Sequence, residues 1–416
     1  MPRPAENKPD IIIIGGGASG LAAACVCAQL GKNTLLLEKE NRVGRKLLAT
    51  GNGRCNILNT EDPVFFGDPD FARQTLSCCG VKEVWAFFLD LGLLIREEED
   101  GRAYPMTNQA STVLDCLRQR AESSPHITVR TDAMVTGIKK DAGGFAVTVK
   151  SGETYFAPSL IAAAGGPAAP KLGGSDSVVG PLRALGHRLI PLRPALSALV
   201  TGTAAIKGLS GLRVPAYLML YDGERAVSAA AGEALFTDYG VSGVCAMQLA
   251  RDAGELIENG RAATLFVDFS PLLGLAPALR RRLAPGEWDS NAARAGVLDL
   301  LISRRDTLGE GMMYTGLLPR PLADKARRLP LDKSASLLGG LKLPVLGIKG
   351  YDQAQVTAGG LDCAEFDSRT LMSKRVPGLY VCGETLNVDG DCGGFNLLFA
   401  WASGILAAKH ACGQLD

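Results

Sequence analysis

Residues 11–20 read Ile-Ile-Ile-Ile-Gly-Gly-Gly-Ala-Ser-Gly, and this stretch decides the fold. Four consecutive β-branched residues predict a buried strand, and the spaced glycines after them predict a tight turn into a helix over residues 21–30. Gly15 permits the turn, Gly17 lets the backbone approach a pyrophosphate, and Gly20 lets helix and strand pack closely. The pattern is typical of a dinucleotide-binding unit, where phosphate meets free backbone N–H groups at the positive end of a helix.

The next strand ends in an acidic residue. Residues 34–37 read Thr-Leu-Leu-Leu, and Glu38 follows them, 18 positions after Gly20. A carboxylate at this place accepts hydrogen bonds from both ribose hydroxyls of a bound dinucleotide. It favours an unphosphorylated ribose, as in FAD or NAD.

Composition predicts a globular protein with a large core. The chain has 416 residues, of which 47% are hydrophobic, so two or three domains are expected. Lys and Arg total 44 against 43 Asp and Glu, which gives no overall basic field for binding nucleic acid. Residues 1–10 are polar, and no apolar stretch approaches the length of a membrane span. We expect a cytoplasmic protein without nucleic-acid or membrane partners; the oligomeric state stays open.

Neither cysteine nor histidine spacing predicts a metal centre or a built-in disulfide centre. The 11 cysteines are scattered and include no Cys-x-x-Cys pair near the nucleotide motif, which is typical of reduced packing thiols. The three histidines, His126, His187 and His410, are far apart in the sequence. We expect no metal site.

The rest of the chain predicts a discontinuous α/β fold. Short strands over 127–157 predict an antiparallel element inserted between parallel units, and a strand over 160–164 runs into Gly165-Gly166. The pattern becomes β-rich after Pro191, helical after Pro271, and α/β again near Leu343. The predicted domains are residues 1–190 and 344–416 for the nucleotide fold, 191–270 for an inserted β unit, and 271–343 for a helical subdomain.

The C-terminal segment completes the predicted site. A strand runs into Gly383-Glu384, Asp389 follows, and Gly393-Gly394-Phe395-Asn396 opens a helix through His410. A carboxylate or backbone group there suits ribitol hydroxyls. A helix N-terminus at Asn396 suits the pyrimidine edge of a reduced flavin, where negative charge develops. The two halves together favour FAD over NAD as the tightly bound cofactor.

Several motifs carry a resemblance that extends through nearly the whole chain. The chain resembles the BaiN/YhiN-type family of FAD-dependent oxidoreductases. The motifs are the glycine turn 15–20, Gly44-Arg45-Lys46, Thr50-Gly51-Asn52-Gly53-Arg54-Cys55-Asn56, Leu235-Phe236-Thr237, Val356-Thr357-Ala358-Gly359-Gly360, and the block from Gly378 to Asn396.

This resemblance implies a Rossmann-like FAD-binding domain in two parts, with an inserted β-barrel unit and a helical subdomain. Some members of the family are described as reducing carbon–carbon double bonds of oxidised bile acids. The implied cofactor-binding residues are Gly15, Gly17, Ala18, Ser19, Gly20, Glu38, Lys39, Arg45, Lys46, Thr50, Gly51, Asn52, Gly53, Val135, Ala164, Gly165, Gly383, Glu384, Asp389, Asn396 and Leu397.

The chain departs from the family pattern at several positions. Asp238 stands where a histidine usually follows Leu-Phe-Thr, and Val244 replaces an expected proline. Residues 163–166 read Ala-Ala-Gly-Gly in place of Ala-Thr-Gly-Gly, and Met372 occupies a position where an acid is common. The flavin motifs are untouched, but Asp238 removes the histidine that would serve as a proton donor.

The predicted activity is that of a flavin-dependent oxidoreductase. NADH or NADPH would reduce FAD at N5, and the hydride would pass to a small organic acceptor such as an enone or a steroid-like C=C bond; the reverse direction stays open. No second glycine fingerprint follows a strand, so the nicotinamide would bind transiently and the kinetics would be ping-pong.

The candidate catalytic residues are Arg54, Asn52 and Cys55. Arg54 would hold a substrate oxygen or a flavin carbonyl, or would close its own loop. Cys55, like Cys392, is a redox candidate whose alternative is packing. Tyr351 or Asp238 would supply a proton.

Two other functions stay open at this point. One is a non-catalytic or redox-sensing FAD-binding protein, and the other is a flavoprotein that modifies RNA. The balanced charge of the chain disfavours the second of these.

Overall fold

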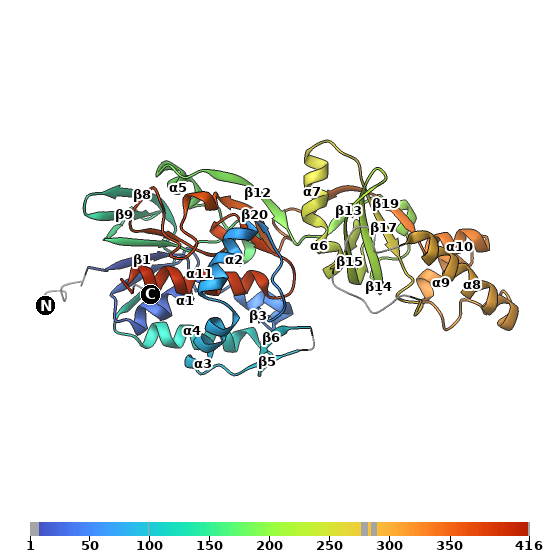
Figure 1. The fold of residues 1–416 in the computed structure, drawn as a ribbon, viewed down its shortest axis with the longest axis horizontal. Coiled ribbons are helices and arrows are strands. Elements are labelled where there is room, and N and C mark those ends of the chain that lie inside the picture. Colours follow the sequence, from blue (N-terminus) through green and yellow to red (C-terminus); the bar gives the residue numbers. More distant parts are fainter. Residues whose placement is uncertain (1–7, 99, 276–281, 284–288, 415–416) are drawn as a thin grey trace. The chain divides into compact units, whose positions relative to one another are not determined.

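The computed structural model describes residues 8–98, 100–275, 282–283 and 289–414, and it divides into two compact units (Figure 1). The first unit comprises Met1–Arg193 and Val356–Asp416, and the second comprises Pro194–Gln355. The predicted separation of the middle segment into a β unit and a helical subdomain with a boundary at residue 271 stays a prediction.

A five-stranded parallel sheet forms the centre of the first unit. Its order is β21 (Leu379–Val381), β11 (Ser159–Ala162), β1 (Ile11–Ile14), β2 (Thr34–Leu37) and β7 (Ile127–Arg130). Every side chain of β1 is buried, because β1 has a strand on each side and helices over the sheet. The sheet therefore places β21, from the end of the chain, two strands away from β1.

The sequence placed residues 127–129 in an antiparallel element, and this prediction was wrong. β7 pairs in parallel with β2, with Leu36 opposite Val129. β7 is the edge strand, so its side chains alternate between half-buried and exposed. That alternation is also typical of an antiparallel strand with one solvated face. The antiparallel element is the next one, a three-stranded sheet in the order β10 (Thr154–Ala157), β9 (Gly144–Val149) and β8 (Val135–Asp141).

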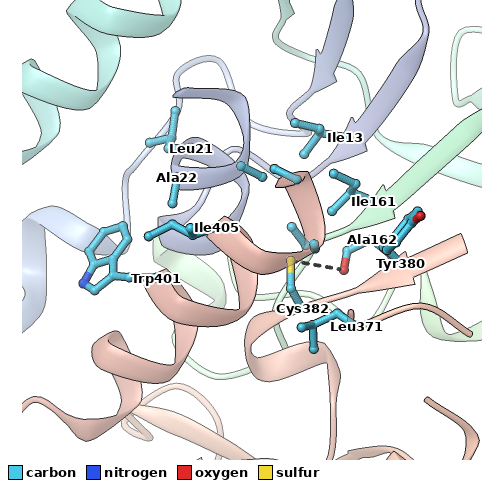
Figure 2. Packing of buried hydrophobic residues seen from close by; sticks show 14 of the residues in the cluster. Ile13, Leu21, Ala22, Ile161, Ala162, Leu371, Tyr380, Cys382, Trp401 and Ile405 are labelled. Carbon is cyan, nitrogen blue, oxygen red and sulfur yellow. Dashed lines mark hydrogen bonds between the residues drawn. The ribbon is translucent and has the colours of Figure 1, made fainter. Parts of the chain in front are cut away.

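Two apolar helices pack together in the core of this unit. Helix α1 (Ala18–Gln29) follows β1, and helix α11 (Phe395–Ala411) comes from the end of the chain. Figure 2 draws Ala22 of α1 and Ile405 of α11 within one buried cluster. Gly404 lets the helices approach, since a Cβ on it would lie 2.3 Å from the carbonyl oxygen of Ser19. The crossing joins the two parts of the discontinuous unit.

The remaining elements of the first unit surround this core. The helices are α2 (Pro69–Cys78), α3 (Val81–Asp90), α4 (Ala110–Ser123) and α5 (Val179–Ala184), with short helical segments η1 (Leu47–Gly53), η2 (Pro170–Leu172), η4 (Cys363–Glu365) and η5 (Gly383–Thr385). The strands are β3 (Leu58–Asn59), β6 (Arg102–Pro105) and β5 (Ile95–Glu97) in one small sheet, and β22 (Val388–Gly390) with β4 (Phe65–Gly67) in another.

The second unit contains a closed β-barrel. Its six strands follow the order β14 (Arg213–Asp222), β17 (Ala263–Asp268), β19 (Leu341–Ile348), β13 (Leu199–Thr201), β16 (Gly240–Ser242) and β15 (Arg225–Phe236). β14 also pairs with β15, which closes the ring, and β18 (Arg282–Leu283) adds to β15. The inserted barrel that the sequence predicted is confirmed.

Helices complete the second unit. They are α6 (Val244–Gln248), α7 (Ala250–Glu258), α8 (Ser290–Leu308), α9 (Arg320–Ala326) and α10 (Leu331–Leu338), with the short segment η3 (Ala204–Ile206). Val297 and Leu301 of α8 are fully buried in the same cluster as the barrel residues Leu265 and Leu343. The helices and the barrel of this unit therefore share one core.

The two connections between the units are paired with each other. β12 (Leu189–Ala195) and β20 (Val356–Leu361) form a two-stranded sheet. A Cβ on Gly359 would lie 2.2 Å from the carbonyl oxygen of Pro191, so these strands are in close contact. Of the helices within the described ranges, none is long and apolar enough to cross a membrane.

Candidate dinucleotide site

The turn between β1 and α1 has the geometry that its glycines predict. Gly15 has a φ of +104°, and a Cβ there would lie 2.5 Å from the carbonyl oxygen of Ala163. A Cβ on Gly20 would lie 1.9 Å from the carbonyl oxygen of Gly15. Gly17 differs, because a Cβ on it would enter open space. Two glycines are thus required by packing, and the third leaves the N-terminus of α1 accessible to a ligand.

Glu38 is anchored at the same turn. Its Oε2 accepts a 2.7 Å hydrogen bond from the N–H of Gly16, and its Oε1 accepts one of 2.8 Å from the N–H of Glu40. Burial raises the pKa of this carboxyl, and the two backbone hydrogen bonds oppose that rise. Each carboxylate oxygen can accept a further hydrogen bond. The geometry therefore leaves acceptors for ribose hydroxyls, and that role stays a prediction.

A polar hollow of about 450 Å³ follows Glu38. Its lining residues are Lys39, Glu40, Asn41, Arg42, Arg45 and Asp132. Glu40 pairs with Lys39 at 3.2 Å and with Arg45, whose other nitrogen donates 2.8 Å to the carbonyl oxygen of Lys171. Lys39 and Arg45, both predicted cofactor residues, thus share one carboxylate in the lining of this hollow.

Lys46 and Glu384 join the two parts of the discontinuous unit. Lys46 Nζ lies 3.0 Å from Glu384 Oε2, although the residues are 338 positions apart in the sequence. The other oxygen, Oε1, accepts a 2.6 Å hydrogen bond from the N–H of Thr357. The structure thus brings together two predicted cofactor residues from opposite ends of the chain.

The loop after Lys46 has an unusual backbone. Gly51, Asn52 and Gly53 have φ values of +56°, +56° and +84°, and Thr50 Oγ1 donates 2.7 Å to the carbonyl oxygen of Leu47. Asn52 is exposed, so its left-handed conformation is not imposed by packing of its side chain. Left-handed non-glycine residues concentrate at ligand sites. This local geometry suits the predicted contact between residues 50–53 and a cofactor.

Arg54 is held by neighbouring side chains. Its Nε donates 2.8 Å to Asn108 Oδ1, it forms an ion pair with Glu98, and its guanidinium carbon lies 3.9 Å above the ring of Tyr104. These contacts are those of a loop-closing residue. They also fix a half-buried guanidinium beside the predicted cofactor loop.

Cys55 lies inside the protein. It is fully buried, and burial raises the pKa of its thiol to about 12. A buried, protonated thiol is a poor nucleophile. These properties match the packing role that the sequence left open for Cys55.

Asn396 fixes the loop ahead of α11. Its Oδ1 accepts 2.7 Å from the N–H of Gly390, and its Nδ2 donates 2.7 Å to the carbonyl oxygen of the same residue. Gly390 ends β22, which contains the buried predicted residue Asp389. The side chain of Asn396 is therefore committed to the protein. The predicted contact with a cofactor through the backbone N–H groups at the start of α11, where the half-buried Leu397 lies, stays a prediction.

The carboxyl ends of β11 and β21 meet beside these loops. The N–H of Gly165 donates 3.0 Å to Thr385 Oγ1, and a Cβ on Gly165 would enter open space. The N–H of Gly383 donates 2.9 Å to Ser403 Oγ, and a Cβ there would lie 2.7 Å from Ser19 Oγ. Ala164 is half-buried next to Gly165. Residues from α1, β11 and η5 thus converge on one edge of the sheet.

Val135, the remaining predicted residue, begins β8 close to Glu38. It is buried, and the N–H of Ala133, two residues earlier, donates 2.8 Å to the carbonyl oxygen of Glu38. Ala18 follows Gly17 as the first residue of α1.

One polar residue in this region was not among the predicted sites. Asn56 Oδ1 is buried and has no hydrogen-bond partner, and it would lie 2.9 Å from a Cβ placed on Gly394. An unpaired buried acceptor is costly unless a ligand supplies a donor. Asn56 ends the motif at residues 50–56, so the position was visible in the sequence, but its burial was not.

Together these features fit an FAD molecule. There is open space next to Gly17 and Gly165, and helices α1 and α11 begin nearby. Asn56 offers an unsatisfied hydrogen-bond acceptor. The open glycines suit a phosphate group. The unsatisfied acceptor of Asn56 suits a polar edge of the flavin ring. Within the described ranges, no group of three or more His, Cys, Asp or Glu side chains is arranged to hold a metal ion.

The proton-donor candidates belong to the second unit. Asp238 is exposed in the turn between β15 and β16, where Thr237 Oγ1 donates 3.0 Å to the carbonyl oxygen of Gly240. Tyr351 is half-buried after β19. Their role stays a prediction.

Comparison with known proteins identifies the family. Residues 9–410 match the HI0933-like protein Rossmann domain family. The chain belongs to this family. The resemblance to the BaiN/YhiN-type FAD-dependent oxidoreductases is thereby confirmed, and the Rossmann-type FAD-binding fold with it.

Two curated relatives match this chain along almost its whole length. The 3-dehydro-bile acid delta(4,6)-reductase of Clostridium scindens is 33% identical and covers 96% of this chain and 98% of its own. The ribosomal RNA dihydrouridine synthase of Escherichia coli is 27% identical and covers 97% of each chain. Among solved structures, the 3-ketosteroid-delta4-(5alpha)-dehydrogenase of Rhodococcus jostii aligns at 16% identity with a TM-score of 0.48, covering 98% of both chains.

Proposed function

We propose that this family member is an FAD-dependent reductase that takes a hydride from NADH or NADPH and delivers it to a carbon–carbon double bond conjugated to a carbonyl. The observation that carries the proposal is the 33% identity with the bile acid reductase over 96% of the chain. The chemistry that FAD supplies when bound is hydride acceptance from a nicotinamide and hydride transfer to an acceptor.

In this proposal the residues of the first unit hold the cofactor. The open N-terminus of α1 at Gly17 binds the pyrophosphate, and Glu38 accepts hydrogen bonds from a ribose. Lys46 and Glu384 form a bridge that keeps the two parts of the unit in register around the cofactor. Asn56 Oδ1 accepts a hydrogen bond from the flavin, which would satisfy the buried atom.

Arg54 is the proposed contact to the acceptor carbonyl. Reduction of a conjugated C=C bond moves negative charge onto the carbonyl oxygen while the hydride adds to the distant carbon. A guanidinium held by Glu98 and Asn108 needs little rearrangement to stabilise that charge. A proton then completes the reduction, and Tyr351 or Asp238 remains the proposed donor.

A small-molecule acceptor is favoured over RNA. Uracil also contains a C=C bond conjugated to a carbonyl, so the relative from E. coli uses the same class of bond in its named reaction. The identity to that relative is lower, at 27%, and the chain carries 44 basic against 43 acidic residues. Proteins that bind RNA usually carry a clear excess of basic residues.

The test is anaerobic reduction followed by reoxidation. Purified protein loaded with FAD is mixed with NADH and, separately, with NADPH, and the flavin absorbance is followed. Reduced protein is then mixed with a steroid enone, a quinone, or ribosomal RNA lacking dihydrouridine. We expect bleaching with at least one nucleotide and rapid reoxidation by the enone alone.

Other results identify the alternatives. A flavin that stays oxidised with both nucleotides would indicate a non-catalytic or redox-sensing protein. Reoxidation by ribosomal RNA, with dihydrouridine formed in it, would replace the small-molecule proposal with RNA modification. Glu38→Gln, compared with Glu153→Gln on the surface, tests the cofactor site, because only the first change should lower FAD retention.

A further inference from the structure

Two cysteines from distant parts of the sequence lie in contact where α1 and α11 end. Cys27 is near the end of α1, and Cys412 directly follows the last residue of α11. Their Sγ atoms are 3.8 Å apart, although 385 positions separate them in the sequence. A disulfide requires an S–S distance of about 2.05 Å, so the two sulfur atoms would have to move closer together for a bond to form.

The two thiols differ in exposure and in acidity. Cys27 is fully buried, whereas Cys412 is half-buried and reachable from solvent. The hydrogen bond with Cys412 and burial raise the pKa of Cys27. The hydrogen bond with Cys27 and the charge of Lys32 outweigh burial and the charge of Asp10, and they lower the pKa of Cys412. Cys412 therefore has the character of an attacking thiolate, and Cys27 that of the second thiol.

Several other cysteines lack this combination. Burial raises the pKa of five further thiols to about 12, namely Cys25, Cys55, Cys79, Cys245 and Cys382. Cys78 is exposed, and Cys116 is half-buried with a pKa that burial raises. At Cys412, an accessible thiol contacts a second thiol, that of Cys27.

We propose that Cys412 and Cys27 form a peroxide-sensitive dithiol, which hydrogen peroxide oxidises to an intramolecular disulfide. The Cys412 thiolate attacks one peroxide oxygen, the O–O bond breaks, and hydroxide leaves and takes a proton to become water. The Cys27 sulfur then attacks the resulting sulfenic acid, the S–O bond breaks, and a second water leaves with the proton of Cys27. Two thiols are oxidised and one peroxide is reduced to two waters.

The disulfide would fasten α1 to α11 at their C-terminal ends. The N-termini of the same helices border the proposed cofactor site, and close contact at Gly404 holds the crossing between them. A covalent link between residues far apart in the sequence restricts the unfolded chain and so stabilises the folded one. The inference does not depend on the proposed reductase activity.

The experiment uses the complete protein. Reduced protein is treated with hydrogen peroxide, remaining thiols are alkylated, and peptides are identified by mass spectrometry before and after reduction with dithiothreitol. We expect a linked pair of peptides containing Cys27 and Cys412, with loss of two hydrogens, which dithiothreitol separates. We also expect a higher melting temperature for the oxidised protein.

Variants provide the controls. Cys412→Ser removes the linked peptide and the rise in melting temperature, whereas Cys116→Ser, at a thiol of similar exposure, leaves both unchanged. Sulfinic acid on Cys412 with Cys27 still free for alkylation would overturn the proposal. So would peroxide-dependent linkage of Cys412 to any other cysteine.

Discussion

Arg54 is the residue on which the proposed chemistry depends most. Its ion pair with Glu98 is one-third exposed on both sides, so the loss of that pair in Arg54→Ala should lower the free energy of unfolding by no more than about 1 kcal/mol. Loss of a group that stabilises developing negative charge costs roughly 100-fold or more in kcat. We expect that loss in enone reduction, with FAD retained, measured by stopped-flow reoxidation and by urea unfolding.

Glu98→Gln serves as the matched variant for Arg54. It removes the partner charge but leaves the guanidinium, its hydrogen bond to Asn108 and its contact with Tyr104. A smaller loss of kcat is expected than with Arg54→Ala. Equal turnover in wild type and Arg54→Ala would leave Arg54 with the loop-closing role alone.

Glu365 should contribute a pH-dependent part of the stability. Its Oε2 lies 2.8 Å from His187 Nδ1 and accepts 3.0 Å from the N–H of Arg188, and its Oε1 lies 2.9 Å from Arg375 Nε. Burial raises the pKa of Glu365, but these hydrogen bonds and the charge of Arg375 outweigh it and hold the pKa below its ordinary value. His187 Nε2 is 3.2 Å from Ser373 Oγ, which completes a buried network.

The sign of the pH effect follows from that lowered pKa. The contribution is fully present above the pKa of an unfolded glutamate, about 4.3, and disappears as the pH falls through the lower folded value. Glu365→Gln should lower the free energy of unfolding at pH 7 by roughly 1.5–3 kcal/mol. Between pH 7 and pH 3, the free energy of unfolding should also decrease less in this variant than in the wild type. Urea unfolding from pH 7 to pH 3 measures this, and identical pH profiles for the two proteins would contradict it.

Among single residues, the sequence predicted positions better than contacts. Gly15, Gly20 and Glu38 could be predicted because each meets a local backbone requirement. Gly15 adopts a positive φ, Gly20 approaches the carbonyl oxygen of Gly15, and Glu38 accepts a hydrogen bond from the N–H of Gly16. The pairing of Lys46 with Glu384 and the orphan acceptor of Asn56 could not, since both depend on loops brought together by the tertiary fold. Asn396 was predicted to turn backbone N–H groups toward the flavin, which stays a prediction, and the hydrogen bond of its side chain to Gly390 could not be predicted.

At the scale of elements, the crossing of α1 and α11 has little tolerance for extra volume. A Cβ on Gly404 would meet backbone atoms of Ser19 at 2.3 Å, and backbone cannot move aside as a flexible side chain can. Gly404→Ala should therefore destabilise the protein by about 1–3 kcal/mol and weaken FAD retention. Thermal unfolding and flavin release measure the two effects.

Gly180→Ala is the control for that substitution. Gly180 lies in α5, and a Cβ on it would enter open space. Alanine is more favourable than glycine inside a helix by up to about 1 kcal/mol. It should leave stability unchanged or raise it slightly. If Gly404→Ala behaved like Gly180→Ala, close packing of the two helices would not limit this site.

Element types were predictable where the hydrophobic period was unambiguous. The run at β1 and the apolar helix after Asn396 form as predicted, because β1 is fully buried and most residues of the helix are buried. β7 was misplaced because edge strands of parallel and antiparallel sheets share the same alternation, and pairing partners are set by the rest of the fold. Closure of the barrel by β14 and β15 likewise required the three-dimensional arrangement.

At the scale of the whole molecule, we expect the insertion to be separable from the predicted cofactor site. Every predicted cofactor residue belongs to the first unit, which comprises Met1–Arg193 and Val356–Asp416. The connecting strands lie side by side, since Gly359 contacts Pro191 and the N–H of Gln355 donates 3.2 Å to the carbonyl oxygen of Leu196. A short Gly/Ser linker can therefore join residue 193 to residue 356 without stretching the chain.

Replacing Pro194–Gln355 by such a linker should leave a folded protein that still binds FAD. The core around β1, α1 and α11 forms a separate cluster of buried side chains from that of the barrel, so it keeps its own packing. Enone reduction should be lost, because the similarity to the bile acid reductase extends through the excised segment. Circular dichroism, FAD stoichiometry and turnover give the three measurements. A shortened protein that is folded but binds no FAD would show that the insertion supplies essential cofactor contacts, against the assignment of all of them to the first unit.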